Sequence, residues 1–345
     1  MPKSFYLGVI EGFYGLPWGQ EQRLAMMPWL ARLGFQAYMY APKADSTLRK
    51  AWQEPLGADE LKQLRRLSGA CHESGLTFVV GLSPYALYES YTNSQRVKLE
   101  GKVRQLVDAG VAGLALLFDD MPGNETSLAQ RQIEICHDVE EWVGGVPLLM
   151  CPTYYSDDPV LDKFFGKRPE GYLEELGVGL SEAVELFWTG PQVCSDNIGS
   201  GDLESVVNAL RRPVALWDNY PVNDSKVRSE HIYVQAVEGR DDSIRPFLSS
   251  HWSNAMNQPA LSLPALASFV ALHGQNVDTE VLSEAGVGAD IQASLSFLAQ
   301  TKRTELSDEA QESLKSAAPE GSMACQELVD WVDGKYEFDP ACLTD

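Results

Sequence analysis

The sequence predicts an α/β fold, a (β/α)8 barrel of the TIM type, with a small helical appendage at its C-terminal end. Strand-like apolar runs alternate with helix-like runs over about 275 residues, the expected size of an eight-unit barrel. Polar and aromatic side chains follow the strand-like runs, where a barrel gathers its loops on one face. The run Leu114–Phe118 is apolar throughout, as in strands that are buried on both faces.

The expected elements follow one another in a regular order. The expected strands are Phe5–Ile10, Gln36–Tyr40, Thr77–Leu82, Leu114–Phe118, Pro147–Cys151, Ala183–Trp188, Val214–Trp217 and Phe247–Trp252. The expected helices are Gln20–Leu33, Ala58–Glu73, Ser94–Ala109, Ser127–Val143, Leu203–Leu210 and Leu263–His273, with a short helix near Tyr172. Helical spacing of apolar residues predicts these helices, and glycines such as Gly34 and Gly75 mark two of their ends.

An open doubly wound sheet is the alternative architecture. No Gly-x-Gly-x-x-Gly sequence follows the first expected strand, and no phosphate-binding loop is found, so the closed barrel is favoured. Past about Asn276, helical periodicity continues without a strand-like run. We therefore expect a catalytic barrel over residues 1–275 and a small helical region over residues 276–345, with Pro340–Asp345 frayed.

Composition excludes several classes of partner. The formal net charge is −22, and so acidic a surface repels nucleic acid and anionic lipid, so neither is an expected partner. No apolar run approaches the roughly 20 residues that span a membrane, and the N-terminus lacks the core of a signal peptide. The six cysteines form no close pairs, which predicts buried thiols in a reducing, cytoplasmic setting.

Metal and nucleophile motifs are missing from the sequence. The five histidines include no His-x-His or His-x-x-x-His pair, and no Gly-x-Ser-x-Gly sequence is present. The adjacent Asp119 and Asp120 suit a divalent cation as hard oxygen ligands, but no third carboxylate lies near them in the sequence. We therefore expect no metal and no cofactor.

The two adjacent aspartates, Asp119 and Asp120, end the fourth expected strand, where barrel folds place their chemistry. Two close carboxylates do not readily ionise together, so one of them is expected to hold a proton near neutral pH. Such a pair provides the acid and the base that proton-transfer hydrolysis needs. The alternative is that Asp119 caps the following turn and Asp120 is solvated. Aromatic and amide-rich strand ends favour a neutral ligand with many hydroxyls, such as a sugar.

Six motifs occur in order at the ends of the expected strands. They are Gly-Val-Ile-Glu-Gly-Phe-Tyr-Gly-x-Pro-Trp at 8–18, Tyr-Ala-Pro-Lys at 40–43, Phe-Asp-Asp at 118–120, Met-Cys-Pro-Thr-x-Tyr at 150–155, Trp-Thr-Gly at 188–190 and Trp-x-Asn-Tyr-Pro-Val-Asn-Asp at 217–224. Together they closely resemble the O-GlcNAcase family of glycoside hydrolases, family 84, over roughly residues 5–273.

The resemblance implies a retaining exo-β-N-acetylglucosaminidase in which the sugar's own acetamido oxygen attacks the anomeric carbon and forms an oxazoline. Asp119 would accept a hydrogen bond from the acetamido nitrogen and stabilise the charge that develops there. Asp120 would protonate the leaving oxygen and then deprotonate the incoming water. Adjacent aspartates cannot easily flank a sugar from opposite faces, so this arrangement fits them better than a carboxylate nucleophile.

The same resemblance implies a set of binding residues. The Gly12 carbonyl and Lys43 would bind sugar hydroxyls, Tyr155 the acetamido oxygen, Thr189 and Trp217 the acetamido methyl, Asn219 and Asn254 the acetamido side or the leaving group, and Asp224 the 4- and 6-hydroxyls. Taken singly, Lys43 would be a solvated lysine and Tyr155 a half-buried core tyrosine. Only their place in the motifs favours the site.

The expected partner is a terminal β-linked N-acetylglucosamine on a glycoprotein or glycan, including sugar on serine or threonine of proteins. Two alternatives are a non-catalytic N-acetylglucosamine-binding barrel and an endo-acting, hyaluronidase-like hydrolase. The net charge of −22 disfavours the polyanionic hyaluronan. Whether the chain forms a homodimer is left open.

Overall fold

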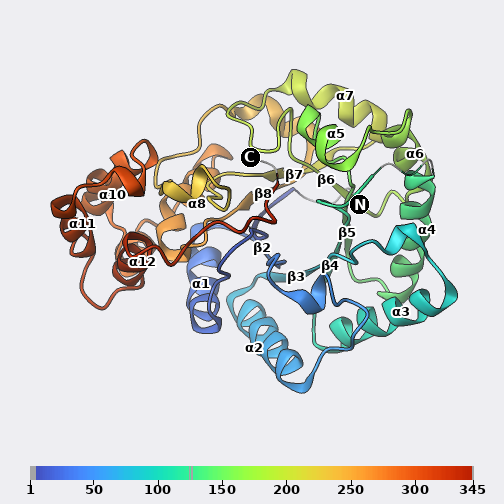
Figure 1. Cartoon of the computed structure of the whole chain (residues 1–345), viewed down its shortest axis with the longest axis horizontal. Coiled ribbons are helices and arrows are strands. Elements are labelled where there is room, and N and C mark those ends of the chain that lie inside the picture. Colours follow the sequence, from blue (N-terminus) through green and yellow to red (C-terminus); the bar gives the residue numbers. More distant parts are fainter. Residues whose placement is uncertain (1–4, 124, 126, 344–345) are drawn as a thin grey trace.

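The computed structural model describes residues 5–123, 125 and 127–343, and within them eight parallel strands close into a barrel surrounded by helices (Figure 1). Strand β1 pairs with β2 on one side and with β8 on the other, so the sheet has no open edge. The predicted (β/α)8 barrel is confirmed, and the open doubly wound sheet is excluded.

Strands and helices alternate along the described chain. The strands are β1 (Tyr6–Glu11), β2 (Ala37–Tyr40), β3 (Thr77–Leu82), β4 (Gly113–Leu117), β5 (Leu148–Cys151), β6 (Glu185–Trp188), β7 (Val214–Asp218) and β8 (Leu248–Asn254). The α-helices are α1 (Gln20–Leu33), α2 (Ala58–Ser74), α3 (Asn93–Asp108), α4 (Leu128–Trp142), α5 (Pro159–Phe165), α6 (Tyr172–Gly179), α7 (Ser200–Leu210), α8 (Pro259–Leu272), α9 (Glu280–Glu284), α10 (Ala289–Leu295), α11 (Asp308–Lys315) and α12 (Met323–Val332). Among the described residues, no helix has the length and apolar character needed to cross a bilayer.

The expected strands match the observed ones to within two residues at either end. Among the expected helices the largest difference is the start of α8, which begins at Pro259, four residues before the expected helix, whereas α5 was not expected at all. A proline at the first helical position lacks only an N–H that would have no partner there, so it begins the helix without penalty.

A buried ion pair fixes the loop that follows β1. The Glu11 carboxylate is fully buried and accepts hydrogen bonds from the Arg23 guanidinium of α1 at 2.7 and 2.8 Å. The Tyr38 hydroxyl and the backbone N–H of Trp18 also donate to Glu11, at 2.5 and 3.1 Å. A buried carboxylate needs such partners, and here they tie both ends of the loop at residues 12–18 to the barrel.

Helix α9 contacts α1, α12 contacts α8 and α11, and from α12 the chain returns toward the middle of the barrel (Figure 1). Exposed ion pairs join the region to the barrel, including Arg32 with Asp278 and Glu284. The Trp331 indole donates to the carbonyl of Ser229 at 3.1 Å. The expected helical character of this region is therefore observed, while its separation as a domain at residue 276 stays a prediction.

Glu327 of α12 caps the N-terminus of α8. Helix starts leave N–H groups without intrahelical partners, and α8 is too deeply buried for water to serve them. The Glu327 carboxylate, 1% exposed, accepts from the N–H groups of Ala260 and Leu261 at 3.0 Å each. Burial raises the pKa of Glu327 to about 8, even though the two N–H groups oppose this rise. The C-terminal region is thereby connected to the helix that follows β8.

This cap predicts a pH-dependent stability. The folded chain holds a proton on Glu327 up to about pH 8, whereas the unfolded chain loses it near pH 4.5, so stability should fall between these values as pH rises. Glu327→Gln cannot titrate, so its free energy of unfolding should rise relative to that of the wild type between pH 5 and pH 8. The difference should grow by up to about 1.4 kcal/mol per pH unit. Urea denaturation at several pH values measures this. Equal pH slopes for wild type and Glu327→Gln would contradict it, and the exposed Glu309→Gln is the control.

Candidate active site

A cavity opens at the carboxyl ends of the barrel strands. Its lining residues are Gly12, Tyr14, Lys43, Asp119, Asp120, Cys151, Tyr155, Thr189, Val193, Cys194, Trp217, Asn219, Val222, Asp224, Ser225, Asn254 and Cys342. Every residue expected at the site from the sequence is among them. They come together because parallel strands of a barrel all end on the same face.

The backbone at Asp120 brings the two aspartates to the same cavity. Neighbouring side chains on a strand point to opposite faces. Asp120 lies beyond the end of β4 and has a φ of +56°, in the left-handed region that few residues other than glycine occupy. This turn lets Asp119 and Asp120 both line the cavity, at a strain of about 1–3 kcal/mol that the surrounding contacts must offset.

Lys43 lies between the two carboxylates. Its ammonium forms an ion pair with Asp119 Oδ2 and lies 3.4 Å from Asp120 Oδ2. The Lys43 side chain is only 5% exposed, so little water screens these charges. The expectation that Lys43 binds a sugar hydroxyl is untested, but its contacts in this structure are with the aspartates.

Asp120 accepts two phenolic hydrogen bonds, from Tyr14 to Oδ2 at 2.8 Å and from Tyr155 to Oδ1 at 2.9 Å. Burial by itself would raise the pKa of Asp120, but Lys43, the two hydroxyls and the Arg49 guanidinium together hold this pKa below its ordinary value. The expectation that one aspartate retains a proton near neutral pH is therefore wrong for Asp120 in the unliganded chain. A cation between the carboxylates removes the repulsion on which that expectation depended.

One oxygen of the aspartate pair has no partner. Asp119 is 6% exposed, and its Oδ1 is buried without a hydrogen bond from any described residue. A buried carboxylate oxygen of this kind is costly unless a donor reaches it. The atom lies on a residue that lines the cavity, so a ligand with an N–H or O–H group is the donor that fits it.

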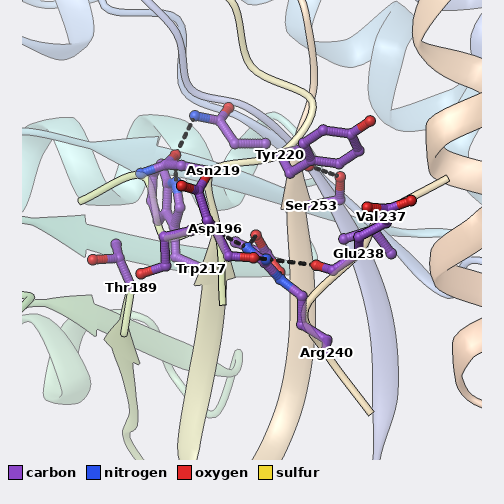
Figure 2. Close-up of polar contacts among 12 residues, drawn as sticks. Thr189, Asp196, Trp217, Asn219, Tyr220, Val237, Glu238, Arg240 and Ser253 are labelled. Atoms are coloured by element: carbon purple, nitrogen blue, oxygen red, sulfur yellow. Dashed lines mark hydrogen bonds and ion pairs between the residues drawn. The ribbon is translucent and has the colours of Figure 1, made fainter. Parts of the chain in front are cut away.

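The amide side of the cavity is a connected network (Figure 2). Asn219 Oδ1 accepts from the Trp217 indole and from Asn254 Nδ2, both at 2.9 Å. Asn254 Oδ1 in turn accepts from the N–H of Gly12 at 3.2 Å. A side chain at position 12 would place its Cβ 2.8 Å from the Trp217 ring, so glycine is required for this close approach. The network holds the indole and both amides in place.

A buried ion pair between Asp218 and Arg240 lies next to this network and was not predicted from the sequence. The Arg240 guanidinium donates to both oxygens of Asp218, at 2.7 and 2.8 Å, and to the carbonyls of Ser195 and Asp196 (Figure 2). His251 contacts Asp218 Oδ2 at 3.1 Å. Arg240 thereby joins β7 to the loop after β6, whose Val193, Cys194 and Thr189 line the cavity. No local signal marks Arg240, because it lies far from its partners in the chain.

Asp224 also lines the cavity and accepts from the N–H of Tyr14 at 2.8 Å. Burial raises the pKa of Asp224 to about 6, although the Tyr14 N–H and Arg228 act against the rise. Among the described residues no cluster of three or more His, Cys, Asp and Glu side chains is arranged to hold a metal ion. The expectation that the site needs no metal or cofactor stays a prediction.

The C-terminal segment reaches the cavity. Cys342 is one of its lining residues, and the carbonyl oxygen of Glu337 lies 3.3 Å from the position of a Cβ on Gly15. The expectation that residues 340–345 are frayed stays a prediction for 340–343, and residues 344 and 345 lie outside the described residues. The cavity has a volume of about 50 Å³, which is room for only a few water molecules.

The comparisons with known proteins all point to the same protein family. The family model described as beta-N-acetylglucosaminidase matches residues 7–310. The Protein O-GlcNAcases of Rattus norvegicus and Mus musculus are each 31% identical over 281 residues, which is 79% of this chain and 29% of theirs. The chain thus spans less than a third of the length of these curated relatives.

A solved structure gives the same result. A mutant of the O-GlcNAc hydrolase of Thermobaculum terrenum aligns with a TM-score of 0.74 and 27% sequence identity, over 91% of this chain and 71% of that chain. The family resemblance drawn from the six motifs is therefore confirmed.

The position of Lys43 predicts a pH-dependent loss of stability. Lys43→Met leaves two buried carboxylates without their cation and should lower the free energy of unfolding by about 3–5 kcal/mol near neutral pH. Lys43 depresses the folded-state pKa of Asp120, so its stabilisation is present above about pH 4 and is lost as pH falls through that depressed value.

The loss in Lys43→Met should therefore keep its full size from pH 7 to about pH 4 and shrink as the pH falls further, through the depressed pKa of Asp120. Urea denaturation across this range measures it, with the exposed Lys50→Met as the control. A loss that stays constant over the whole range would show that the cation–carboxylate interaction is not its cause.

Proposed function

Because the chain belongs to the beta-N-acetylglucosaminidase family, we propose that it is a retaining exo-β-N-acetylglucosaminidase with substrate-assisted catalysis. The observation that carries the proposal is the buried, unpartnered Oδ1 of Asp119, next to Asp120 in one cavity. The acetamido N–H of N-acetylglucosamine is a donor of the kind that this oxygen requires. A plain glucoside has a hydroxyl at the same carbon, which can donate a hydrogen bond but offers no acetamido oxygen to attack the anomeric carbon.

The reaction proceeds in two balanced steps. In the first, the acetamido oxygen forms a bond to the anomeric carbon, the bond from that carbon to the leaving oxygen breaks, and Asp120 gives its proton to the leaving oxygen. The acetamido nitrogen becomes positively charged, and the Asp119 carboxylate stabilises it through the N–H hydrogen bond. In the second step, Asp120 removes a proton from water as the water opens the oxazoline.

The placement of the carboxylates supports this route over one with a carboxylate nucleophile. Asp119 and Asp120 both reach the ammonium of Lys43, so they act from one side of the cavity. A nucleophile and an acid that flank a glycosidic bond are separate carboxylates on opposite faces of the sugar. A sugar whose acetamide provides the nucleophile needs only neighbouring acids.

Sugar binding prepares Asp120 as the acid. In the unliganded chain, Lys43 is the strongest of the contacts that lower the pKa of Asp120. If Lys43 turns to a sugar hydroxyl, as the family motif implies, that charge moves away and the pKa of Asp120 rises. Lys43 and Cys342 both line the cavity, so a movement of either would widen the space for a sugar.

The remaining pocket residues take the roles that the motifs imply. Trp217, Thr189 and Tyr155 enclose the acetamide, Asn219 and Asn254 bind the acetamido side or the leaving group, and the Gly12 carbonyl and Asp224 bind hydroxyls of the sugar. The locked amide network supports a preorganised pocket, because its groups need not reorient when the sugar enters.

The natural substrate that we propose is N-acetylglucosamine on serine or threonine of proteins. This proposal is supported by the names of the relatives, Protein O-GlcNAcase and O-GlcNAc hydrolase, and by the sequence identity to them. Cytoplasmic location belongs to the same proposal, supported by six cysteines that form no disulfide.

The leaving-group test separates the two aspartates. Asp120→Ala should slow hydrolysis of substrates with poor leaving groups far more than that of activated aryl β-N-acetylglucosaminides, because only the poor leaving groups need a proton. Asp119→Ala should lower both rates, by about 10²–10⁴. Steady-state kinetics with both substrate classes measure this, and equal losses in Asp120→Ala would remove it from the acid role.

The wild type tests the mechanism itself. It should cleave an aryl β-N-acetylglucosaminide but not the matching β-glucoside. The rate of hydrolysis should fall as fluorines are added to the acetamide of the substrate. Binding of the sugar without cleavage would favour a non-catalytic barrel. Equal cleavage of both glycosides would mean that an enzyme carboxylate is the nucleophile.

The raised pKa of Asp224 predicts how KM changes with pH on the acidic side of the profile. Its carboxyl takes up a proton below about pH 6 and then has fewer lone pairs to offer to two sugar hydroxyls. KM for the aryl substrate should therefore rise as pH falls below about 6. Asp224→Asn should have a high KM that lacks this rise. The same acidic rise in the variant would assign it to another group.

A further inference from the structure

A buried arginine, Arg49, lies near the proposed acid and was not predicted there from the sequence. Arg49 follows the short 3₁₀ helix at Ser46–Leu48 and is only 5% exposed. Its guanidinium carbon lies 5.4 Å from the centre of the Tyr14 ring and 5.7 Å from that of Tyr85. Its Nε is buried and has no hydrogen-bond partner among the described residues. Burying a guanidinium with an unsatisfied N–H group costs free energy, which suggests that Arg49 has a role beyond packing.

The guanidinium determines where the Tyr14 proton points. Arg49 Nη2 donates to the Tyr14 hydroxyl oxygen at 3.2 Å. A guanidinium has donors only, so it cannot accept the single proton of that hydroxyl. The proton is then directed to the other neighbour of the oxygen, Asp120 Oδ2, at 2.8 Å. The positive charge also polarises the hydroxyl and strengthens its bond to the carboxylate.

We propose that Arg49 is a positioning residue for Asp120, acting through Tyr14, which it holds as a donor to the carboxylate. The inference rests on the acid–base role proposed for Asp120. When Asp120 carries its proton, Tyr14 and Arg49 both face it as donors, and the protonated form is disfavoured. Arg49 therefore makes Asp120 a stronger acid in the first step and favours the carboxylate that must remove a proton from water in the second.

Arg49 acts among several charged and titratable neighbours of Asp120. Those that face it are Lys43 and Asp119, Tyr14, Tyr155 and Asp224. The sugar is expected to draw Lys43 away, whereas Arg49 is not among the residues that line the cavity and donates to the Tyr14 hydroxyl. Arg49 is thus the cation that stays in place throughout the reaction.

The first test does not depend on hydrolysis. The carboxyl carbon of Asp120, assigned by the loss of its signal in Asp120→Asn, is titrated by NMR in the unliganded protein. Arg49→Met keeps the length of the stem but removes the charge, and it should move the titration of Asp120 upward by about one pH unit. Arg49→Lys keeps the charge and should move it less. Titration at the same pH in wild type and Arg49→Met would overturn the proposal, whether or not the protein is active.

The second test uses the reaction. In Arg49→Met the basic limb of the kcat profile should move to higher pH, and poor leaving groups should lose more rate than activated aryl ones. If Arg49 had only a structural role, the variant would hydrolyse both substrate classes more slowly by the same factor, and the basic limb of the kcat profile would stay at the same pH. Absence of hydrolysis in the wild type would instead refute the proposed function and leave the NMR result standing.

A double-mutant cycle shows whether the effect passes through Tyr14. Tyr14→Phe removes only the hydroxyl and is the variant expected to fold if Arg49→Met does not. The combined variant should lose no more rate on poor leaving groups than Tyr14→Phe alone, because both changes break the same contact. Independent, multiplying losses would show that Arg49 does not act through Tyr14.

Discussion

The site is organised around one buried cation placed between two carboxylates. Lys43 contacts both Asp119 and Asp120 in a cavity where water screens charge poorly, and its charge is the strongest of the contacts that hold the pKa of Asp120 below its ordinary value. The left-handed backbone at Asp120, which turns both acids to one side, is stable only because this cation and the hydroxyls of Tyr14 and Tyr155 receive them. The free chain is thus an ion-paired form of the site, which the sugar must rearrange.

The loops that carry the site residues are fixed by buried ion pairs outside the cavity. Glu11 and Arg23 hold the loop after β1, which presents Tyr14. Asp218 and Arg240 hold the loop after β6 to the end of β7, behind the amide network. Such pairs contribute little net stability, because desolvation offsets their attraction, but they define a single geometry. Preorganised groups of this kind are what electrostatic catalysis needs.

The C-terminal region contributes to the barrel at two levels. Glu327 satisfies the first N–H groups of α8, the helix that begins shortly after the cavity residue Asn254. Farther along, Cys342 forms part of the cavity wall itself. A segment that is distant in sequence and follows the last helix of the barrel therefore helps to shape the space in which the sugar is proposed to bind.

The sequence by itself determined the barrel and the composition of the site. Apolar runs and helical periodicity are local patterns, and the ends of parallel strands meet on one face, so motif residues such as Lys43 and Asp120 were predicted to converge. Only the tertiary structure decided how these groups interact. The pairing of Lys43 with the aspartates, the lowered pKa of Asp120, the buried Arg49 beside Tyr14 and the arrival of Cys342 depend on distances between residues far apart in the chain. Local patterns contain no information about such distances, because they arise when the barrel closes.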